Sequence, residues 1–461
     1  MSDRSTPERR VGDSSLGRSA EPAGQGRLWH NWPGNHSWRP RTVLEPATGV
    51  ALRHAVGDAV RTGRRIKPVG ERHSLNDIAA ADDILLQLRG WTGMVAHDAG
   101  RRQVTVRSGT RLWQLPPILE PLGLAMPNLG DIDRQSIAGA IATGTHGTGL
   151  QLAGLASQVV GLTMIDGRGE ELTITEDDPD LLNACRIGLG ALGVVTEVTL
   201  QCVPAFDLHV VERREALDDV LGDWEARLAG ADHFEFFWFP ATDEVITSSR
   251  DRVDRDVEVR SPRTSRIGDL LRAEVLDNAA LAVMCEVGRF APDAVPVLNR
   301  IATAAWTLRD RTDRSDLVLT STRRVKFQEM EYAFAVADVP QVLADLRVRL
   351  ARDGVKVTFP IEVRAAAADD AWLSTAHGRP TGYVAVHQYA RQDAEDYFTG
   401  CAEVFDAHDG RPHWGKHHAL TADELAPKYP RMVDFLALRD RHDPDRLFTN
   451  DHLDRVLGHR P

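Results

Sequence analysis

The sequence predicts an α+β protein with more than one domain. The chain has 461 residues, which is more than a single hydrophobic core usually organises. Its first regular elements read strand, helix and strand, and the elements after them read mostly as short strands separated by turns. The composition, 42% apolar and 26% charged, is typical of a soluble globular protein.

The predicted elements follow one another closely over the first two hundred residues. Residues 42–44 are expected to form a strand, Thr48 to cap a helix that ends near residue 62, and residues 65–69 to form a second strand. A polar turn over 70–77 follows at a strand's carboxyl end, where α/β proteins usually bind ligands. The other expected elements are strands at 84–88, 93–97 and 103–106, a helix at about 111–122, a hairpin of strands 159–165 and 171–174, and a buried strand at 193–202.

Charge, cysteine spacing and the first residues of the chain exclude several classes of protein. A formal net charge of −12 argues against a nucleic-acid partner, which would need clustered cations. No apolar run approaches the roughly twenty residues that cross a bilayer, so no transmembrane segment is expected. Residues 1–27 contain no apolar run and read as a disordered tail rather than a secretory signal. Four widely spaced cysteines indicate reduced thiols, which makes the cytoplasm the expected location.

The segment from Ser136 to Gly149 consists almost entirely of small residues. Glycine and alanine let the backbone approach a ligand closely, and Ser136 is expected to cap a short helix whose free N–H groups suit a phosphate. The segment therefore suits a cofactor that carries a pyrophosphate. Taken alone, it is equally compatible with a close helix–helix contact or an ordinary loop.

Several segments in a fixed order along the chain carry a resemblance to a known family. The chain resembles the aldonolactone oxidoreductases, a group that includes L-gulono-1,4-lactone and D-arabinono-1,4-lactone oxidases, within the vanillyl-alcohol oxidase and p-cresol methylhydroxylase superfamily. The resemblance extends from about Trp29 to the end of the chain. The segments that carry it are the turn ending in His73-Ser74, then 127–130, 136–149, 233–240, Met330-Glu331-Tyr332, 360–364, 411–416 and 443–448.

This resemblance implies a two-lobed FAD-binding domain at 28–206 and a sheet-based α+β cap domain at 207–410. A C-terminal segment, 411–461, is implied to return to the flavin. Residues 249–270, rich in Arg, Asp and Ser, are expected to be an exposed excursion of the cap. The cofactor-binding residues that it implies are Pro68, Val69, Gly70, Glu71, Arg72, His73, Ser74, Asp131, Ser136, Gly139, Ala140, Ile141, Ala142, His146 and Val195.

The resemblance also implies a covalent bond between the flavin and the histidine at position 73. Relatives have glycine before this histidine, whereas this chain has Arg72, whose Cβ makes a positive φ costly. The Arg72 guanidinium is instead suited to pair with a pyrophosphate. We therefore expect FAD to bind, with covalent attachment through His73 depending on whether Arg72 permits it.

Candidate catalytic residues lie in the later motifs. Glu362 and Arg364 are one residue apart on a predicted strand, so both point to one face, which is ordinarily a solvated face. The resemblance assigns this pair and Lys416, beside the flavin, to catalysis and substrate binding. His387 alternates with apolar residues and faces either the substrate or the core. Asp131 stands where alditol oxidases have a substrate-contacting serine, which favours a lactone or sugar acid derivative over a polyol.

Together these residues predict an FAD-dependent oxidoreductase that oxidises the C2 hydroxyl of an aldono-1,4-lactone of the L-gulono-1,4-lactone type. The product would be of the ascorbate type, and the electron acceptor oxygen or another molecule. One alternative is an alditol oxidase that makes an aldose and hydrogen peroxide, and another is a carbohydrate-binding relative that has lost its flavin because of Arg72. No metal site is expected, because His413 and His417 lack a His-Glu-x-x-His pattern.

Overall fold

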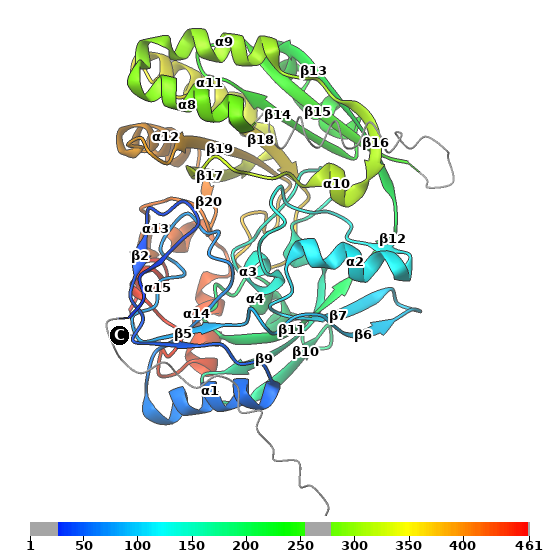
Figure 1. The fold of residues 1–461 in the computed structure, drawn as a ribbon, viewed down its shortest axis with the longest axis vertical. Helices are drawn as coiled ribbons and strands as arrows, with labels where there is room; N and C mark the ends of the chain where they lie inside the picture. Colours follow the sequence, from blue (N-terminus) through cyan, green and yellow to red (C-terminus); the bar gives the residue numbers. More distant parts are fainter. Residues whose placement is uncertain (1–25, 254–277, 460–461) are drawn as a thin grey trace, which may run out of the picture.

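The protein folds into two lobes, as the ribbon of the computed structural model shows in Figure 1. The structure describes residues 26–253 and 278–459. Helices and sheets occur in both lobes, which confirms the predicted α+β class. The first lobe contains a three-stranded and a five-stranded sheet, and the second is built on one eight-stranded sheet, the large sheet.

The three-stranded sheet contains the strand–helix–strand unit that the sequence predicts. Its strands, in the order β3 (Thr42–Leu44), β5 (Ile84–Gln87) and β4 (Ile66–Val69), are parallel. Helix α1 (Gly49–Thr62) connects β3 to β4, and the Thr48 hydroxyl caps it by accepting from the Ala51 amide. Leu52, Val56 and Ala59 recur on one helical face and are buried against the sheet.

The five-stranded sheet is antiparallel and follows the predicted strands closely. Its order is β10 (Glu171–Thr175), β9 (Val159–Asp166), β11 (Gly193–Gln201), β7 (Gln103–Arg107) and β6 (Met94–Asp98). The helix expected at 111–122 is only partly present, because α2 (Leu115–Leu119) lies between two 3₁₀ turns. Prolines at 116, 117 and 121 lack the N–H that a longer helix would need. The other elements of this lobe are β1 (Trp29–His30), β2 (Ser37–Trp38), β8 (Leu124–Ala125), α3 (Ile137–Ala142), α4 (Pro179–Arg186) and β12 (Val203–Pro204).

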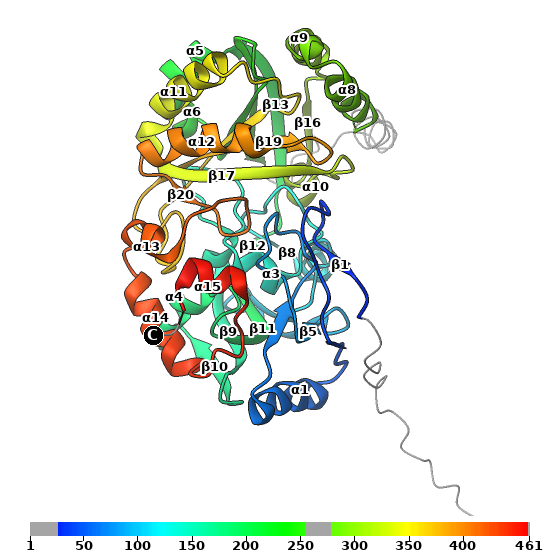
Figure 2. The same ribbon diagram turned by 90° about the vertical axis from the view of Figure 1, so that its left-hand side faces the viewer.

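Four helices of the second lobe pack on one face of the large sheet. Leucine, valine and aromatic side chains of α5 (Leu217–Gly222), α6 (Trp224–Ala229), α11 (Val339–Arg352) and α12 (Glu395–Ala407) form one core with this face. Helices α8 (Asn278–Phe290) and α9 (Val295–Ala305) lie at the same end of the molecule (Figure 2). The opposite face turns toward the first lobe. The strand order is β16 (Asp310–Arg314), β13 (Asp207–Ala216), β15 (Glu244–Val253), β14 (His233–Trp238), β18 (Ile361–Ala366), β19 (Thr381–Tyr389), β17 (Phe327–Ala335) and β20 (Arg411–Pro412).

The end of the chain packs on the first lobe. Helices α13 (Ala422–Leu425), α14 (Met432–His442) and α15 (Asp451–Leu457) lie beside it in both ribbon views. Their apolar side chains, such as Phe435 and Leu453, join the core of that lobe, as do Val318 and Leu319 of α10 (Ser315–Leu319). Of the excursion expected at 249–270, residues 249–253 end β15 and the rest lie outside the described residues. None of the helices in the described ranges is long and apolar enough to span a membrane.

The small-residue segment is tightly enclosed. Ser136 caps α3 as predicted, its hydroxyl accepting from the Gly139 amide at 3.3 Å. A Cβ at Gly147 would lie 2.3 Å from the Leu129 carbonyl oxygen and 2.5 Å from the Asn128 side-chain oxygen. The backbone of the segment therefore lies directly against its neighbours, and glycine is required there for space.

We predict that Gly147→Ala lowers the free energy of unfolding by about 1–3 kcal/mol, because the added methyl group overpacks the site. Urea denaturation followed by circular dichroism measures the change. Gly57→Ala is the matched control, since no heavy atom outside α1 lies within 4 Å of the added Cβ. It should be neutral or stabilising by about 0.5–1 kcal/mol. Equal losses in both variants would contradict the packing argument.

Candidate active site

A cleft of about 1220 Å³, open to solvent at its mouth, runs through the first lobe. The loop after β4, helix α3 and the start of β11 form its walls. Ala140 lies in the core instead, and Asp131 and His146 lie toward the second lobe. The predicted cofactor-binding residues that line the cleft are Pro68, Val69, Gly70, Glu71, Arg72, His73, Ser74, Ser136, Gly139, Ile141, Ala142 and Val195.

Two glycines allow the walls of this cleft to approach each other. A Cβ at Gly70 would lie 2.5 Å from the Ser136 hydroxyl oxygen, and one at Gly139 would lie 3.0 Å from the same atom. The loop after β4 and the start of α3 thus meet backbone to backbone. This bare surface leaves main-chain groups accessible to an extended ligand.

Arg72 adopts a backbone conformation that is strained for a residue with a Cβ. Its φ is +63°, in the left-handed region that glycine would occupy without cost. The guanidinium lies 4.8 Å from the centre of the Trp29 ring and donates to the His30 carbonyl oxygen at 3.2 Å. The Arg72 carbonyl accepts from the Trp32 amide at 2.8 Å. These contacts with the residues around β1 offset the strain, so the loop keeps its shape without glycine.

His73 presents an unpaired nitrogen inside the cleft. Its Nδ1 is buried and has no hydrogen-bond partner, and the side chain lines the cleft. Burial, the largest effect, lowers the pKa of His73 to about 4, with Glu71 opposing the shift. The ring is therefore neutral at physiological pH, and one of its nitrogens is available to a ligand.

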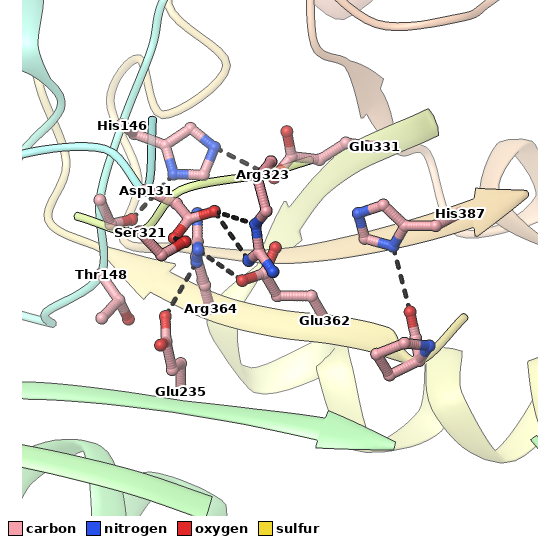
Figure 3. Close-up of polar contacts among 12 residues, drawn as sticks. Asp131, His146, Thr148, Glu235, Ser321, Arg323, Glu331, Glu362, Arg364 and His387 are labelled. Carbon is pink, nitrogen blue, oxygen red and sulfur yellow. Dashed lines mark hydrogen bonds and ion pairs between the residues drawn. The ribbon is translucent and has the colours of Figure 1, made fainter. Parts of the chain in front are cut away.

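The face of the large sheet turned toward the first lobe is polar, yet it is buried. Along β18 the odd-numbered Ile361, Val363 and Ala365 pack on the helices, so Glu362 and Arg364 point the other way. The same alternation on β14, β17 and β19 places further ionisable groups on this face, the site face (Figure 3). Its buried polar residues are Glu235, Glu329, Glu331, Glu362 and His387, and Arg364, with 11% of its side chain exposed, lies among them.

Arg364 lies at the centre of an ion-pair network on this face. Its Nε contacts a Glu235 oxygen at 3.0 Å, and its Nη2 donates to Glu362, as the shared strand face predicts. Arg250 pairs with Glu235 from the other side. Burial raises the pKa of Glu362 to about 8, with Arg364 opposing the shift and the Glu235 and Asp131 carboxylates supporting it. Glu362 is therefore the carboxyl group of this network that most readily holds a proton.

Asp131 links the two lobes rather than lying free in the site. Ser321 donates to one carboxylate oxygen of Asp131 at 2.6 Å, and Arg323 contacts the other at 2.7 Å. Burial alone would raise the pKa of Asp131, but Arg323 and Arg364 lower it to about 2. Asp131 is thus ionised and already paired, and it is available to a substrate only beside these two arginines.

Lys416 is held by both lobes. The Gly415 carbonyl accepts from the Leu75 amide at 2.8 Å, and the Asn76 side chain donates to the Lys416 carbonyl at 2.8 Å. These bonds join the Lys416 segment to the loop that carries His73. The Lys416 ammonium lies 2.5 Å from a carboxylate oxygen of Glu329. Glu329 keeps the cation on the site face, near the histidine end of the cleft.

His387 lies on the site face, with its ring against Phe327 and Phe359 of the apolar core. Its Nδ1 is 3.1 Å from the Pro360 carbonyl oxygen, so this nitrogen donates and Nε2 keeps its lone pair. Nε2 lies 3.7 Å from Glu329, which is the cross-strand partner of His387. Burial is the main effect that lowers the pKa of His387. The neutral ring can therefore accept a proton at Nε2.

The cleft and the site face meet along the small-residue segment. The Gly149 amide donates to the Ala365 carbonyl at 2.7 Å, one residue beyond Arg364. The Thr148 hydroxyl donates to the Phe234 carbonyl, one residue before Glu235. The structure thus brings the bend before Gly149 against the strands that carry Arg364 and Glu235.

Sequence reasoning did not assign roles to several residues of this site. Glu235, Glu329 and Glu331 carry a detectable signal, because each is a carboxylate that alternates with apolar residues on a strand. Arg250 lies near the end of β15, and Arg323 lies in a loop that contacts Asp131 across 192 positions of the chain. Nothing local in the sequence marks either arginine.

Comparisons with known proteins agree with this geometry. Residues 198–456 match the family model described as D-arabinono-1,4-lactone oxidase. The chain belongs to this family. Residues 40–175 match the FAD binding domain model, so the chain carries an FAD-binding domain and the cleft described above lies largely within it. The resemblance to the aldonolactone oxidoreductases is thereby confirmed.

Individual relatives support the same assignment. The L-gulono-1,4-lactone dehydrogenase of Mycobacterium tuberculosis is 40% identical over 431 residues, covering 94% of this chain and 99% of that protein. The L-gulonolactone oxidase of Scyliorhinus torazame is 31% identical, covering 94% and 98% of the two chains. A cholesterol oxidase from B. sterolicum superposes with a TM-score of 0.76 at 17% identity, over 93% of this chain and 96% of that chain. That structural match shows the fold alone.

Proposed function

We propose that this member of the family is an FAD-dependent oxidoreductase that oxidises the C2 hydroxyl of an aldono-1,4-lactone, of the L-gulono-1,4-lactone type. In this proposal residues 28–206 hold FAD, residues 207–410 form the cap, and residues 411–461 return to the cofactor. The observation that carries it is the junction of the cleft with the buried charged face of the large sheet. The named relatives support the choice of a lactone.

The residues of the cleft fit FAD on structural grounds. The bare contact of Gly70 with Ser136 provides backbone groups for a pyrophosphate, and the unpaired Nδ1 of His73 lies in the same cleft. FAD, when bound, supplies a hydride acceptor for the C–H bond beside the substrate hydroxyl.

The site face supplies the remaining chemistry. A sugar lactone presents several oxygens, and the cations of Arg364 and Lys416 bind and orient them. His387 accepts the hydroxyl proton at Nε2, and Glu362 completes the hydrogen-bonding network beside Arg364. Asp131, paired with Arg323, contacts the substrate from the first lobe. The burial of these groups excludes bulk water from the reacting atoms.

Steady-state assays with L-gulono-1,4-lactone and with xylitol or sorbitol test the proposal, each with oxygen and with an artificial electron acceptor. We expect turnover of the lactone and little or none of the alditols. Turnover of alditols alone, with hydrogen peroxide formed, would replace the lactone assignment by an alditol oxidase. The same assays identify the acceptor. A cytoplasmic location remains part of the proposal, and the four buried, unpaired cysteines favour it.

We further predict that the flavin is bound covalently through His73. Arg72 has a positive φ, so the loop adopts a backbone conformation that glycine would take without cost. The yellow colour should stay with the polypeptide after acid precipitation, and His73→Ala should release it while still binding FAD. Colour that is lost from the wild-type protein would contradict the bond. Protein that is colourless and stays so after incubation with FAD would instead indicate a flavin-less binding protein.

A further inference from the structure

Three buried ionisable side chains meet where the two lobes join. They are His146 of the small-residue segment, Glu331 of β17 and His413 from the C-terminal part of the chain. One ligand atom of each lies within 4.8 Å of the others, close enough to hold a metal ion. The hydrogen bonds of the two histidine rings distinguish a metal site from a network of hydrogen-bonded side chains.

Each ring nitrogen of His146 faces an oxygen atom. Nδ1 lies 2.9 Å from the Gly147 carbonyl oxygen, which can only accept, so this nitrogen donates. Nε2 lies 3.2 Å from a carboxylate oxygen of Glu331. Burial would raise the pKa of Glu331, but His146 and Lys416 hold it well below its usual value. The His146 ring therefore lies between a backbone carbonyl and the Glu331 carboxylate.

His413 has no lone pair available for a metal ion. Its Nδ1 accepts from the Gly415 amide at 3.0 Å, so a neutral ring carries its proton on Nε2. Burial, as the main effect, lowers the pKa of His413 to about 4 and keeps the ring neutral. Since His146 Nδ1 is likewise taken up by the Gly147 carbonyl, the cluster has the hydrogen-bonding pattern of a closed polar network.

Glu331 connects this network to the substrate site. Its second carboxylate oxygen lies 3.9 Å from the Lys416 ammonium, which Glu329 contacts from the other side. The backbone reinforces the arrangement, because the His413 amide donates to the Glu331 carbonyl and the His417 amide donates to the Glu329 carbonyl, both at 2.9 Å. The Lys416 cation thus lies between two carboxylates of one strand.

The His146 ring is also fixed in orientation. It stacks on Tyr383 of β19 with ring centres 3.6 Å apart and an angle of 18° between the planes. The Tyr383 hydroxyl lies 3.1 Å from the Thr375 hydroxyl, which keeps that ring in place. A side chain held by stacking, by a hydrogen bond to Gly147 and by contact with Glu331 has little freedom to move.

We propose that His146 is a positioning residue for Lys416: its ring, stacked on Tyr383, fixes the Glu331 carboxylate, which with Glu329 holds the ammonium where the lactone oxygens bind. His146 thereby acts through Glu331 and does not itself touch the substrate. The inference rests on the proposed function, in which Lys416 contacts the lactone. It gives a specific role to the histidine of the small-residue segment.

A double-mutant cycle with Lys416→Met tests this role. His146→Leu should lower kcat/KM for the lactone by about 100-fold, because the ammonium is displaced. His146→Gln keeps one amide donor toward Glu331 and should recover most of that loss. In the Lys416→Met background, His146→Leu should cause no further loss, since the group that it positions is gone. Independent, multiplicative losses would overturn the proposal.

Two controls separate this inference from a folding defect and from the proposed function. His209→Leu removes a histidine that contacts Asp310 at 3.4 Å on the surface, and it should leave kcat/KM unchanged. Elemental analysis of the wild-type protein should find no bound metal at this cluster, and one equivalent of zinc that is lost in His146→Gln would refute the inference. Wild-type protein that oxidises no lactone would instead refute the proposed function.

Discussion

Replacing Arg364 with leucine is expected to abolish turnover and to lower the free energy of unfolding by about 3–5 kcal/mol. Only 11% of the side chain is exposed, and it contacts Glu235 and Glu362, so its removal leaves the Glu362 carboxyl without its cation. Activity should fall by at least about 10³-fold, because a charged donor to the substrate is also lost. Urea denaturation and steady-state kinetics measure the two effects.

Arg364→Lys separates the two effects. Lysine keeps the positive charge but not the planar fork that contacts both carboxylates, so stability should largely recover while activity should not. Arg347→Leu is the control, because its pair with Asp218 is exposed and contributes about 0–1 kcal/mol. An Arg347→Leu variant as unstable as Arg364→Leu would show that burial of the network is not the cause.

Much of the fold could be predicted because the signals are local. The strand at 42–44 and the Thr48-capped helix follow from apolar spacing and a capping residue within a few positions. The expected helix at 111–122 was wrong in extent, because its three prolines interrupt the N–H donors of a longer helix. Local pattern therefore gave these elements and failed in extent where prolines interrupt backbone hydrogen bonding.

The candidate site was predictable only in part, because some of its contacts join residues far apart in the sequence. Period-two alternation placed Glu362 and Arg364 on one face, and the structure joins them by a hydrogen bond. Asp131 and Arg323 meet only because the lobes close on each other, and no pattern within either segment predicts that contact. Arg72 shows a third case, in which contacts with the distant Trp29 and His30 stabilise a backbone that local rules disfavour.

Replacing His387 with glutamine is expected to lower kcat by about 10²–10⁴-fold, the usual effect of removing a general base. Glutamine can keep the hydrogen bond to the Pro360 carbonyl but cannot accept a proton at the position of Nε2. Steady-state kinetics at saturating lactone measure the loss. A variant that keeps wild-type kcat would remove His387 from the proton transfer.

The pH dependence of kcat/KM distinguishes His387 from Glu362 as the proton acceptor, because the environments of the two groups shift their pKa values in opposite directions. Burial lowers the pKa of His387 from 6.5, so a rate that depends on its neutral ring falls only below about pH 6.5. Burial raises the pKa of Glu362 to about 8, so a rate that depends on its carboxylate would still be rising at pH 7. We expect kcat/KM of the wild-type enzyme to fall only below about pH 6.5, and we expect this fall to be absent in His387→Gln. If kcat/KM instead rises with a midpoint near pH 8, and this rise persists in His387→Gln and disappears in Glu362→Gln, then Glu362 is the proton acceptor.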